Sequence, residues 1–406
     1  MKTRADRQSL TLLLLFATSL LGELDYQIIP PLLPLLAASF HIKPGYAGQL
    51  VSVYAISSGF SSLLFGYLSD RHGRTPFIKY ALIGFCTSAL LTSFAPTVEV
   101  LYLSRFLTGM ATGCFTTCAL SYAADSFHYE LRGRAMGILS AAYFAAAIIG
   151  IPVVTAVAAK MGWRPIFWVI SGSSLCLAIL VWQFLQLHPH PASQAPTSPD
   201  QLGIGQLAKI LMGSMKRRDT SAILLASLLS SGAIVGFITY LGSHLNRNLL
   251  VPIDQVGLIF LWAGLTSLVG APLAGALADR LGKKPLLIVS GLVLAFCLLV
   301  IPRLPLGMLL FACLGLAGFA IACRMAPLLS IITEIVAPQE RGTLLALRNA
   351  LSQVGIAAST FVSSYFYLYS GYGVVGLFSA ALVIVSTLLV LLLVGEPTPD
   401  LRTRRN

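Results

Sequence analysis

Long apolar stretches separated by short polar segments follow one another along the whole chain. Each stretch has roughly 20 residues, enough for a helix to cross a hydrocarbon core of about 30 Å. The pattern therefore predicts an all-α polytopic membrane protein with twelve transmembrane helices. These are expected near residues 9–36, 47–68, 77–95, 98–122, 135–159, 164–186, 220–243, 255–278, 285–302, 305–332, 343–367 and 372–395.

Composition and charge agree with a membrane protein. Of the 406 residues 56% are hydrophobic and only 10% charged, whereas soluble domains carry roughly a quarter charged residues. The net charge of +12 could suggest a nucleic-acid partner, but 19 of the 27 Lys and Arg residues fall on one side of the predicted topology. Another 5 fall on the opposite side and 3 within the helices. Because basic loops stay in the cytoplasm, both termini are predicted to be cytoplasmic, with the lipid bilayer as partner and no nucleic acid.

The sequence repeats itself at a constant offset of 209 residues. The matched pairs are Gly48 and Gly257, Gly66 and Gly275, Asp70 and Asp279, Arg71 and Arg280, Gly73 and Gly282, Pro76 and Pro285, Asp125 and Glu334, Arg132 and Arg341, and Gly133 and Gly342. A register kept over some 85 residues indicates an internal duplication. We expect an N-terminal six-helix half at 1–186, a cytoplasmic linker at 187–219 and a C-terminal six-helix half at 220–406, with a solute site between the halves.

The loop after the second predicted helix carries the most specific motif. Its sequence is Gly66-Tyr-Leu-Ser-Asp70-Arg71-His-Gly73-Arg74, echoed in the second half from Gly275 to Lys284. It resembles the signature loop of the major facilitator superfamily, and within it the bacterial drug and metabolite efflux branch with proton antiport. The resemblance covers nearly the whole chain. It implies a transporter of the bacterial cytoplasmic (inner) membrane that works as a monomer on a small-molecule substrate, with protons and no cofactor.

The charged residues of this loop predict a conformational latch. Gly66 allows close helix packing, Asp70 ends the helix with a carboxylate, and Gly73 permits a tight turn. Our hypothesis is that the latch holds the outward-facing state by closing the cytoplasmic side. Its proposed members are Gly66, Asp70, Arg71, Gly73, Arg74, Asp125 and Arg132, with Asp279, Arg280, Glu334 and Arg341 in the second half. The alternative is that the cluster only fixes topology and solvates the loop.

A second motif, from Leu101 to Gly109, contains Arg105 within the fourth predicted helix. It resembles a family motif whose arginine is linked to proton coupling, although Thr108 stands where the family usually has glutamine. A guanidinium in a bilayer costs several kcal/mol unless it is paired or hydrated, so Arg105 is expected to face the bundle interior. The alternative is an arginine near the outer interface that snorkels to water.

Glu23 and Asp25 in the first helix are the expected carboxylate partners in proton coupling. Two positions on a helix differ by about 200° of rotation, so only one of them faces the cavity. Asp25 stands nine residues before Pro34, similar to the Asp-x8-Pro arrangement of the family's first helix, and is slightly favoured for the proton. Glu23 shares a polar stripe with Tyr26 and Gln27 and remains the alternative.

Four residues are candidate substrate contacts: Tyr26, Gln27, Tyr240 and Arg324. Arg324 has Phe115 at the matching position of the first half, and it could bind an anionic group or pair with a carboxylate of the first helix. For the aromatic residues the alternative is packing at the membrane interface.

Export of a drug, sugar or metabolite is the leading function. The fifth helix has Gly150-Ile-Pro152 where efflux members usually have Gly-Pro followed by paired glycines, which resembles sugar-efflux and arabinose-efflux members. An importer or facilitator on the same fold is the alternative, and a non-transporting receptor is a remote one. No nucleotide-binding loop and no Cys and His ligand cluster occurs in the sequence, so neither an enzyme nor a metal site is expected.

Overall fold

The computed structural model describes residues 4–127, 129–185, 217–335 and 341–395. Within these ranges it contains twelve membrane-length spans, and two of the spans are interrupted helices. The first span consists of α1 (Arg4–Gln27) and α2 (Ile29–Ser39). The fifth consists of α6 (Tyr129–Ala145), a π-helical turn η1 (Ala146–Gly150) and α7 (Ile151–Met161). Gly150 ends this π-turn and Pro152 lies in the first turn of α7, so the sequence Gly150-Ile-Pro152 lies where the span is interrupted.

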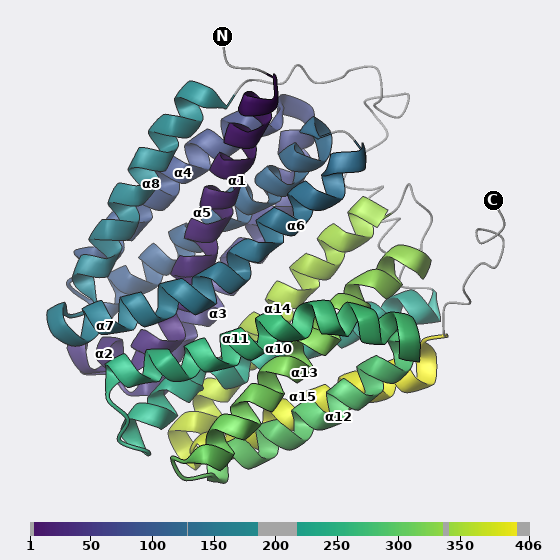
Figure 1. The fold of residues 1–406 in the computed structure, drawn as a ribbon. Helices are drawn as coiled ribbons and strands as arrows, with labels where there is room; N and C mark the ends of the chain where they lie inside the picture. The colour runs from purple at the N-terminus through teal and green to yellow at the C-terminus, as the bar shows by residue number, and fades with distance from the viewer. Residues whose placement is uncertain (1–3, 128, 186–216, 336–340, 396–406) are drawn as a thin grey trace.

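The other spans are nearly continuous helices. The N-terminal half has α3 (Pro44–His72), α4 (Arg74–Ser93), α5 (Val98–Ser126) and α8 (Arg164–Phe184). The C-terminal half has α10 (Arg218–Arg247), α11 (Ile253–Leu281), α12 (Lys283–Val300) with a 3-10 turn η2 (Ile301–Arg303), α13 (Met308–Ile335), α14 (Arg341–Ser370) and α15 (Tyr372–Leu393). Figure 1 shows the two sets as separate bundles. The predicted linker lies outside the described residues, except that α10 already begins at Arg218.

The duplication found in the sequence extends to the helix boundaries. The bounds of α11 are those of α3 shifted by 209 residues, and each helix has 29 residues. Gly73 and Gly282 follow these helices with φ angles of 86° and 90°, a backbone conformation that favours glycine. Each glycine is followed at once by the next helix, α4 or α12. The prediction of two pseudo-symmetric six-helix halves is therefore confirmed.

Hydropathy alone identifies ten of the described helices as long and apolar enough to cross a membrane. The two other long helices, α5 and α14, have 29 and 30 residues but are more polar. Both pack extensively on other helices: α5 on α3 and α4, and α14 on α10 and α3. A helix enclosed by protein needs no continuous apolar surface, so polar side chains are tolerated there.

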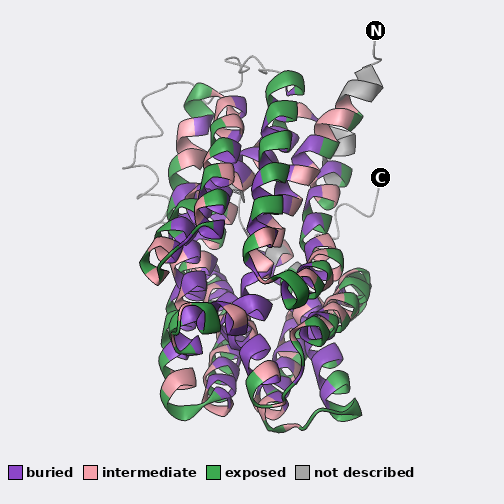
Figure 2. Cartoon of the chain, turned by 90° about the vertical axis from the view of Figure 1, so that its left-hand side faces the viewer, coloured by how far each residue is buried: buried purple, intermediate pink, exposed green. Residues whose placement is uncertain are grey.

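Exposed residues lie on the outward faces of the helices. Figure 2 shows this distribution, with buried residues between helices and exposed residues turned away from them. Many exposed side chains are large and apolar, such as Leu63, Trp168 and Val289. In a membrane protein such a surface faces lipid, where it costs no free energy.

The two halves meet at one end of the molecule. The contacts join α2, α3 and α7 of the N-terminal half to α10, α11 and α14 of the C-terminal half. At Gly242 in α10, an added Cβ would lie 2.6 Å from the carbonyl oxygen of Pro30 in α2. In Figure 1 the bundles converge near α2 and α7 and spread apart toward the side where the termini are drawn. If the termini are cytoplasmic, as the sequence predicts, the closed end is the one away from the cytoplasm.

Candidate functional site

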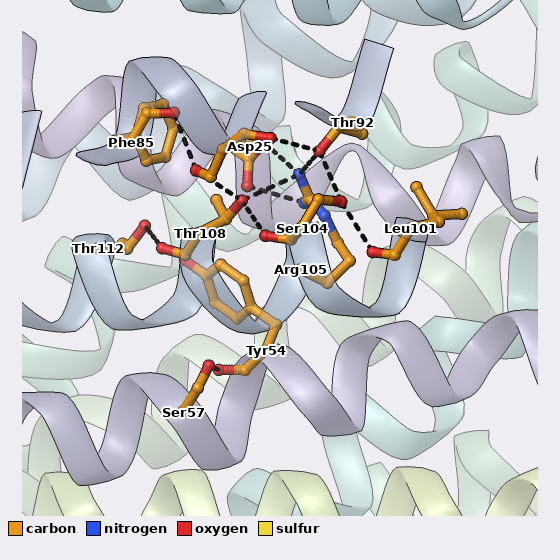
Figure 3. A network of polar contacts seen from close by, with 11 residues as sticks. Asp25, Tyr54, Ser57, Phe85, Thr92, Leu101, Ser104, Arg105, Thr108 and Thr112 are labelled. Atoms are coloured by element: carbon orange, nitrogen blue, oxygen red, sulfur yellow. Dashed lines mark hydrogen bonds and ion pairs between the residues drawn. The ribbon is translucent and has the colours of Figure 1, made fainter. Parts of the chain in front are cut away.

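A buried ion pair joins α1 to α5. Arg105 Nη1 donates to Asp25 Oδ2 at 2.9 Å and Nη2 donates to Oδ1 at 3.1 Å, so the contact is bidentate (Figure 3). Both residues have no exposed surface. The guanidinium carbon also lies 5.2 Å from the ring centroid of Phe167 in α8. Charge-assisted bidentate contacts and a ring face lower the cost of burying these charges.

Local sequence explains why Asp25 lies where the first span is interrupted. Asp25 occupies the last turn of α1, and α2 begins with Ile29 followed by Pro30 and Pro31. Proline has no N–H to donate to the carbonyl four residues earlier, so two backbone hydrogen bonds of a continuous helix are absent here. The carboxylate is thereby placed next to a joint between two rigid helical segments.

Hydroxyl groups surround the guanidinium of Arg105. Its Nη2 donates to Thr92 Oγ1 at 3.3 Å and to Thr108 Oγ1 at 3.5 Å. Thr92 Oγ1 lies 2.9 Å from Ser104 Oγ, and Thr108 Oγ1 lies 3.0 Å from Ser88 Oγ. We call these four residues of α4 and α5 the hydroxyl cage (Figure 3).

Glu23 lies on a different side of α1 from Asp25. It is half-buried, and its Oε2 accepts a hydrogen bond of 3.4 Å from Gln27 Nε2. Gln27 Nε2 also donates to the carbonyl oxygen of Tyr143 in α6 at 3.1 Å. Two acids two positions apart therefore have separate environments, one fully enclosed and ion-paired, the other partly exposed.

Aromatic rings border the same part of α1. Tyr26 stacks on Tyr54 of α3, with ring centroids 5.3 Å apart and planes inclined by 25°. Tyr143 is exposed and packs edge-on against Phe144 at 5.5 Å. Glu23 and these rings place a carboxylate beside aromatic surface.

The N-terminal members of the proposed latch lie together. Arg74 forms ion pairs with Asp70 and, at 3.4 Å, with Asp125 at the end of α5. Arg74 Nη1 also donates to Ser69 Oγ at 2.8 Å. Arg71 is exposed and donates to the hydroxyl of Tyr67 at 3.4 Å. In this conformation the described contacts of Arg74 fall within the N-terminal half.

For the remaining residues of the proposed latch the structure describes few contacts. Gly66 faces α5, where an added Cβ would lie 3.5 Å from the methyl of Thr117. Asp279 and Arg280 are exposed at the end of α11. The side chains of Arg132, Glu334 and Arg341 lie outside the described ones. A contact of the latch across the two halves stays a prediction for the outward-facing state.

Arg324 lies inside the C-terminal half with no exposed surface. Its Nε donates to Ser230 Oγ at 3.0 Å and its Nη2 to Ser386 Oγ at 2.6 Å. Its Nη1 donates to Thr387 Oγ1 at 3.2 Å and to the carbonyl oxygen of Leu287 at 3.1 Å. The guanidinium thus contacts α10, α12 and α15, while the carboxylate of the first span is paired with another arginine. A contact of Arg324 with substrate stays a prediction.

Tyr240 takes part in the closed contact between the halves. Its hydroxyl lies 3.3 Å from the carbonyl oxygen of Gly45 in α3 and 3.2 Å from that of Thr360 in α14. Its ring stacks on Tyr367 at 5.0 Å. Gly48 leaves room for the phenol, because an added Cβ there would overlap it. Tyr240 therefore seals this end, and its contact with substrate stays a prediction.

Sequence reasoning missed the hydroxyl cage and the residues around Arg324. Ser88 and Thr92 each adjoin another hydroxyl residue within α4, and Ser386 does so within α15. Hydroxyl residues in membrane helices carry no motif, because they can also donate to their own backbone. Only the positions of the two arginines could have directed attention to them.

Comparison with known proteins agrees with this architecture. The sequence matches the family model of the Major Facilitator Superfamily over residues 15–248 and again over 220–406. The MFS-type transporter YceJ of Bacillus subtilis is 27% identical over 374 residues, covering 92% of this chain and 93% of that protein. Multidrug resistance protein MdtG of Proteus mirabilis is 26% identical over 372 residues, covering 88% and 89%.

Solved structures show the same fold. The D-xylose-proton symporter superimposes with a TM-score of 0.75 at 18% identity, covering 95% of this chain and 98% of that one. A bacterial homologue of the human lysosomal transporter Spinster, in an inward-facing and occupied conformation, gives 0.76 at 15% identity, covering 95% and 96%. The family match spans nearly all of the sequence, in two parts that overlap over residues 220–248. The chain therefore belongs to the Major Facilitator Superfamily.

Proposed function

We propose that this secondary transporter exports a small organic solute in exchange for protons, by alternating access of a site between its halves. Family membership makes it a multi-pass membrane transporter of a small molecule and not an enzyme. The exchange and its direction are our proposal. It is carried by one observation, the fully buried pair of Asp25 and Arg105 at the joint of the first span.

Protonation of Asp25 would change how α1 is held. The ionised carboxylate makes two charge-assisted hydrogen bonds to Arg105, and a neutral carboxyl group makes weaker ones. Asp25 directly precedes the break into α2, and α2 packs on α10 of the other half. When the ion pair between α1 and α5 weakens, the change therefore reaches the contact of α2 with α10 between the halves. Such a link between protonation and conformation is what proton coupling requires.

We place the solute near the partly exposed face of α1. Glu23, Tyr26 and Gln27 offer a carboxylate, an aromatic ring and an amide there. This assigns the proton to Asp25 and solute contact to Glu23. The names of two relatives support an organic solute: MdtG is called a multidrug resistance protein, and one Cupriavidus pinatubonensis relative is called a probable 4-methylmuconolactone transporter.

We further propose that Asp70, Arg74 and Asp125 close the cytoplasmic side in the outward-facing state. The N-terminal part of this latch is already assembled, so only its partners in the C-terminal half would have to approach. The amino terminus of α14, which begins at Arg341, carries the positive end of the helix dipole, which would attract a carboxylate. We also propose that the termini are cytoplasmic, that the membrane is the bacterial inner membrane, and that the monomer is the functional unit.

Proton movement in proteoliposomes tests the proposal. A panel of sugars, dyes and hydrophobic cations would be applied as gradients to the wild type and to Asp25→Asn, Glu23→Gln and Glu99→Gln. Glu99 is an exposed acid of α5 and serves as the matched control. We expect a solute gradient to drive protons in the opposite direction, with coupling lost in Asp25→Asn and kept in Glu99→Gln. Solute flux without proton movement would instead indicate a facilitator. Protons that move in the same direction as the solute would indicate an importer.

A further inference from the structure

Each half contains one fully buried arginine on its fourth span. Arg105 of α5 contacts α1, α4 and α8, which are the first, third and sixth spans of its half. Arg324 of α13 contacts α10, α12 and α15, which are the same three spans of the other half. The two residues do not match at the offset of the sequence repeat, since Arg324 corresponds to Phe115. The same helices are thus joined by an arginine in both bundles, at different depths.

The two arginines differ in what accepts their hydrogen bonds. Arg105 has a carboxylate, whereas the described partners of Arg324 are three hydroxyls and one backbone carbonyl, at 2.6–3.2 Å. Burying a guanidinium is costly unless its donors are satisfied. The C-terminal half shows that neutral oxygens from neighbouring helices are sufficient in this protein.

Arg105 already has neutral oxygens within reach. Its distances to Thr92 Oγ1 and Thr108 Oγ1 are 3.3 Å and 3.5 Å, longer than any of the contacts of Arg324. Longer distances to the threonines are expected while Arg105 makes its best-aligned hydrogen bonds to Asp25. Thr108 is also the position where the efflux motif departs from its usual glutamine, and a short hydroxyl fits beside the pair.

We propose that Thr92 and Thr108 are positioning residues that hold the charge of Arg105 when Asp25 is protonated, as hydroxyls hold Arg324 permanently. The inference rests on the proposed role of Asp25 in proton exchange. It makes the proton step possible inside the bundle, because the loss of one negative charge does not leave the guanidinium without acceptors. Because none of its described partners is titratable, Arg324 is then a fixed counterpart of Arg105.

The step balances within these groups. A proton from the open aqueous side forms an O–H bond on the Asp25 carboxylate, and the guanidinium keeps its own protons. Nη2 of Arg105 turns its hydrogen bonds toward Thr92 and Thr108, which accept through lone pairs. Their hydroxyl protons remain donated to backbone carbonyls, of Ser88 at 2.9 Å for Thr92 and of Ser104 at 2.7 Å for Thr108. On the other side of the membrane the O–H bond breaks and the ion pair forms again.

In the part of the chain that the structure describes, few other titratable groups lie near Asp25. Besides Arg105, Tyr54 of α3 interacts electrostatically with Asp25, and Glu23 lies two residues away on the same helix. Tyr143 of α6 interacts with Glu23, and α8 presents the uncharged ring of Phe167.

The pH profile of solute-driven proton movement tests the cage. Thr92→Val and Thr108→Val keep the side-chain shape but remove the acceptor, so Asp25 should protonate only in more acidic solution. We expect the midpoint of the profile to fall by about one pH unit in each variant, the effect of weakening one hydrogen bond to a charged group. Thr87→Val is the matched control, because the exposed Thr87 of α4 donates only to the carbonyl of Gly84 in its own helix. An unchanged midpoint in both cage variants would overturn the proposal.

A second measurement does not depend on transport. Asp25→Asn mimics the neutral carboxyl group, so in this variant the hydroxyl cage must hold the charge of Arg105 without help from a carboxylate. We expect Thr92→Val to lower the thermal unfolding temperature of the purified protein more in the Asp25→Asn background than in the wild type. Equal losses in the two backgrounds would contradict the cage. Unequal losses with no proton movement would keep the cage and reject only the antiport function, so the two failures are distinguishable.

Discussion

At the scale of single residues, the most consequential feature is the ion pair inside the N-terminal bundle. Asp25 and Arg105 are both fully enclosed, and each satisfies the other. Removing one partner of a buried pair leaves an uncompensated charge, which costs more than the pair contributes. The fork of the guanidinium also matters, because only arginine matches both carboxylate oxygens at once.

Substitution of Arg105 tests how much this ion pair contributes to stability. We expect Arg105→Gln to lower the free energy of unfolding by about 3–5 kcal/mol, because Asp25 stays buried without a countercharge. Arg105→Lys should lose less, since it keeps the charge but donates from a single point. Thermal and chemical unfolding in detergent measure both. The double variant Arg105→Gln with Asp25→Asn should regain part of the loss, and a strictly additive double variant would speak against the pair.

At the scale of helices, close packing depends on a few glycines. Gly109 and Gly113 of α5 lie against the backbone of α3, at Tyr54 and Ser58, where an added Cβ would overlap backbone atoms. Backbone cannot give way as a flexible side chain can, so α5 would be displaced as a whole. That displacement would also move Arg105, four residues before Gly109, away from α1.

Gly109→Ala should therefore impair both stability and coupling. We expect a loss of about 1–3 kcal/mol in unfolding free energy, as for overpacked sites, together with reduced proton-coupled flux. Gly137→Ala in α6 is the matched control, because nothing described lies within 4 Å of an added Cβ there. If the two substitutions behaved alike, the close contact of α3 and α5 would not be what fixes Arg105.

At the scale of the whole molecule, contacts between the halves close one end, and the proposed alternating access requires these contacts to open. Gln49 of α3 donates to Ser364 of α14 across the halves at 3.0 Å. We expect Gln49→Cys with Ser364→Cys, in a background lacking the seven native cysteines, to be joined by a short bifunctional thiol reagent. Transport should stop in the cross-linked protein and persist in the two single-cysteine variants treated alike. Undiminished transport after complete cross-linking would show that this contact need not separate.

The proposed latch residues lie at the opposite end of α3, around Asp70 and Arg74. Asp70→Asn removes a charge from the cluster around Arg74 and Asp125, so the outward-facing state should lose population. The readout is labelling of a single cysteine at position 364, which becomes accessible only when the closed end opens. We expect several-fold slower labelling than with Asp70 intact, for a difference of about 1 kcal/mol. Unaltered labelling and transport would leave the cluster with a purely topological role.

Several residues show where sequence reasoning reached its limit. Asp25 and Arg105 could each be chosen from motifs, but Glu23 competed for the same role because helix geometry separates the two acids without saying which one faces α5. Arg324 stood out as a lone charge, yet its partners come from helices up to 94 residues away along the chain. The hydroxyl cage left no signal at all, because a threonine in an apolar helix is common and usually serves its own backbone.

By itself the sequence determined the number of spans, the duplication and the superfamily resemblance. The bilayer requires apolar helices of a fixed length, and a repeat in register survives only in related halves. The tertiary structure alone decided which charges meet and which end is closed. Asp25 and Arg105 are 80 residues apart in the chain, and their contact depends on the packing of α1 on α5, which no local pattern encodes.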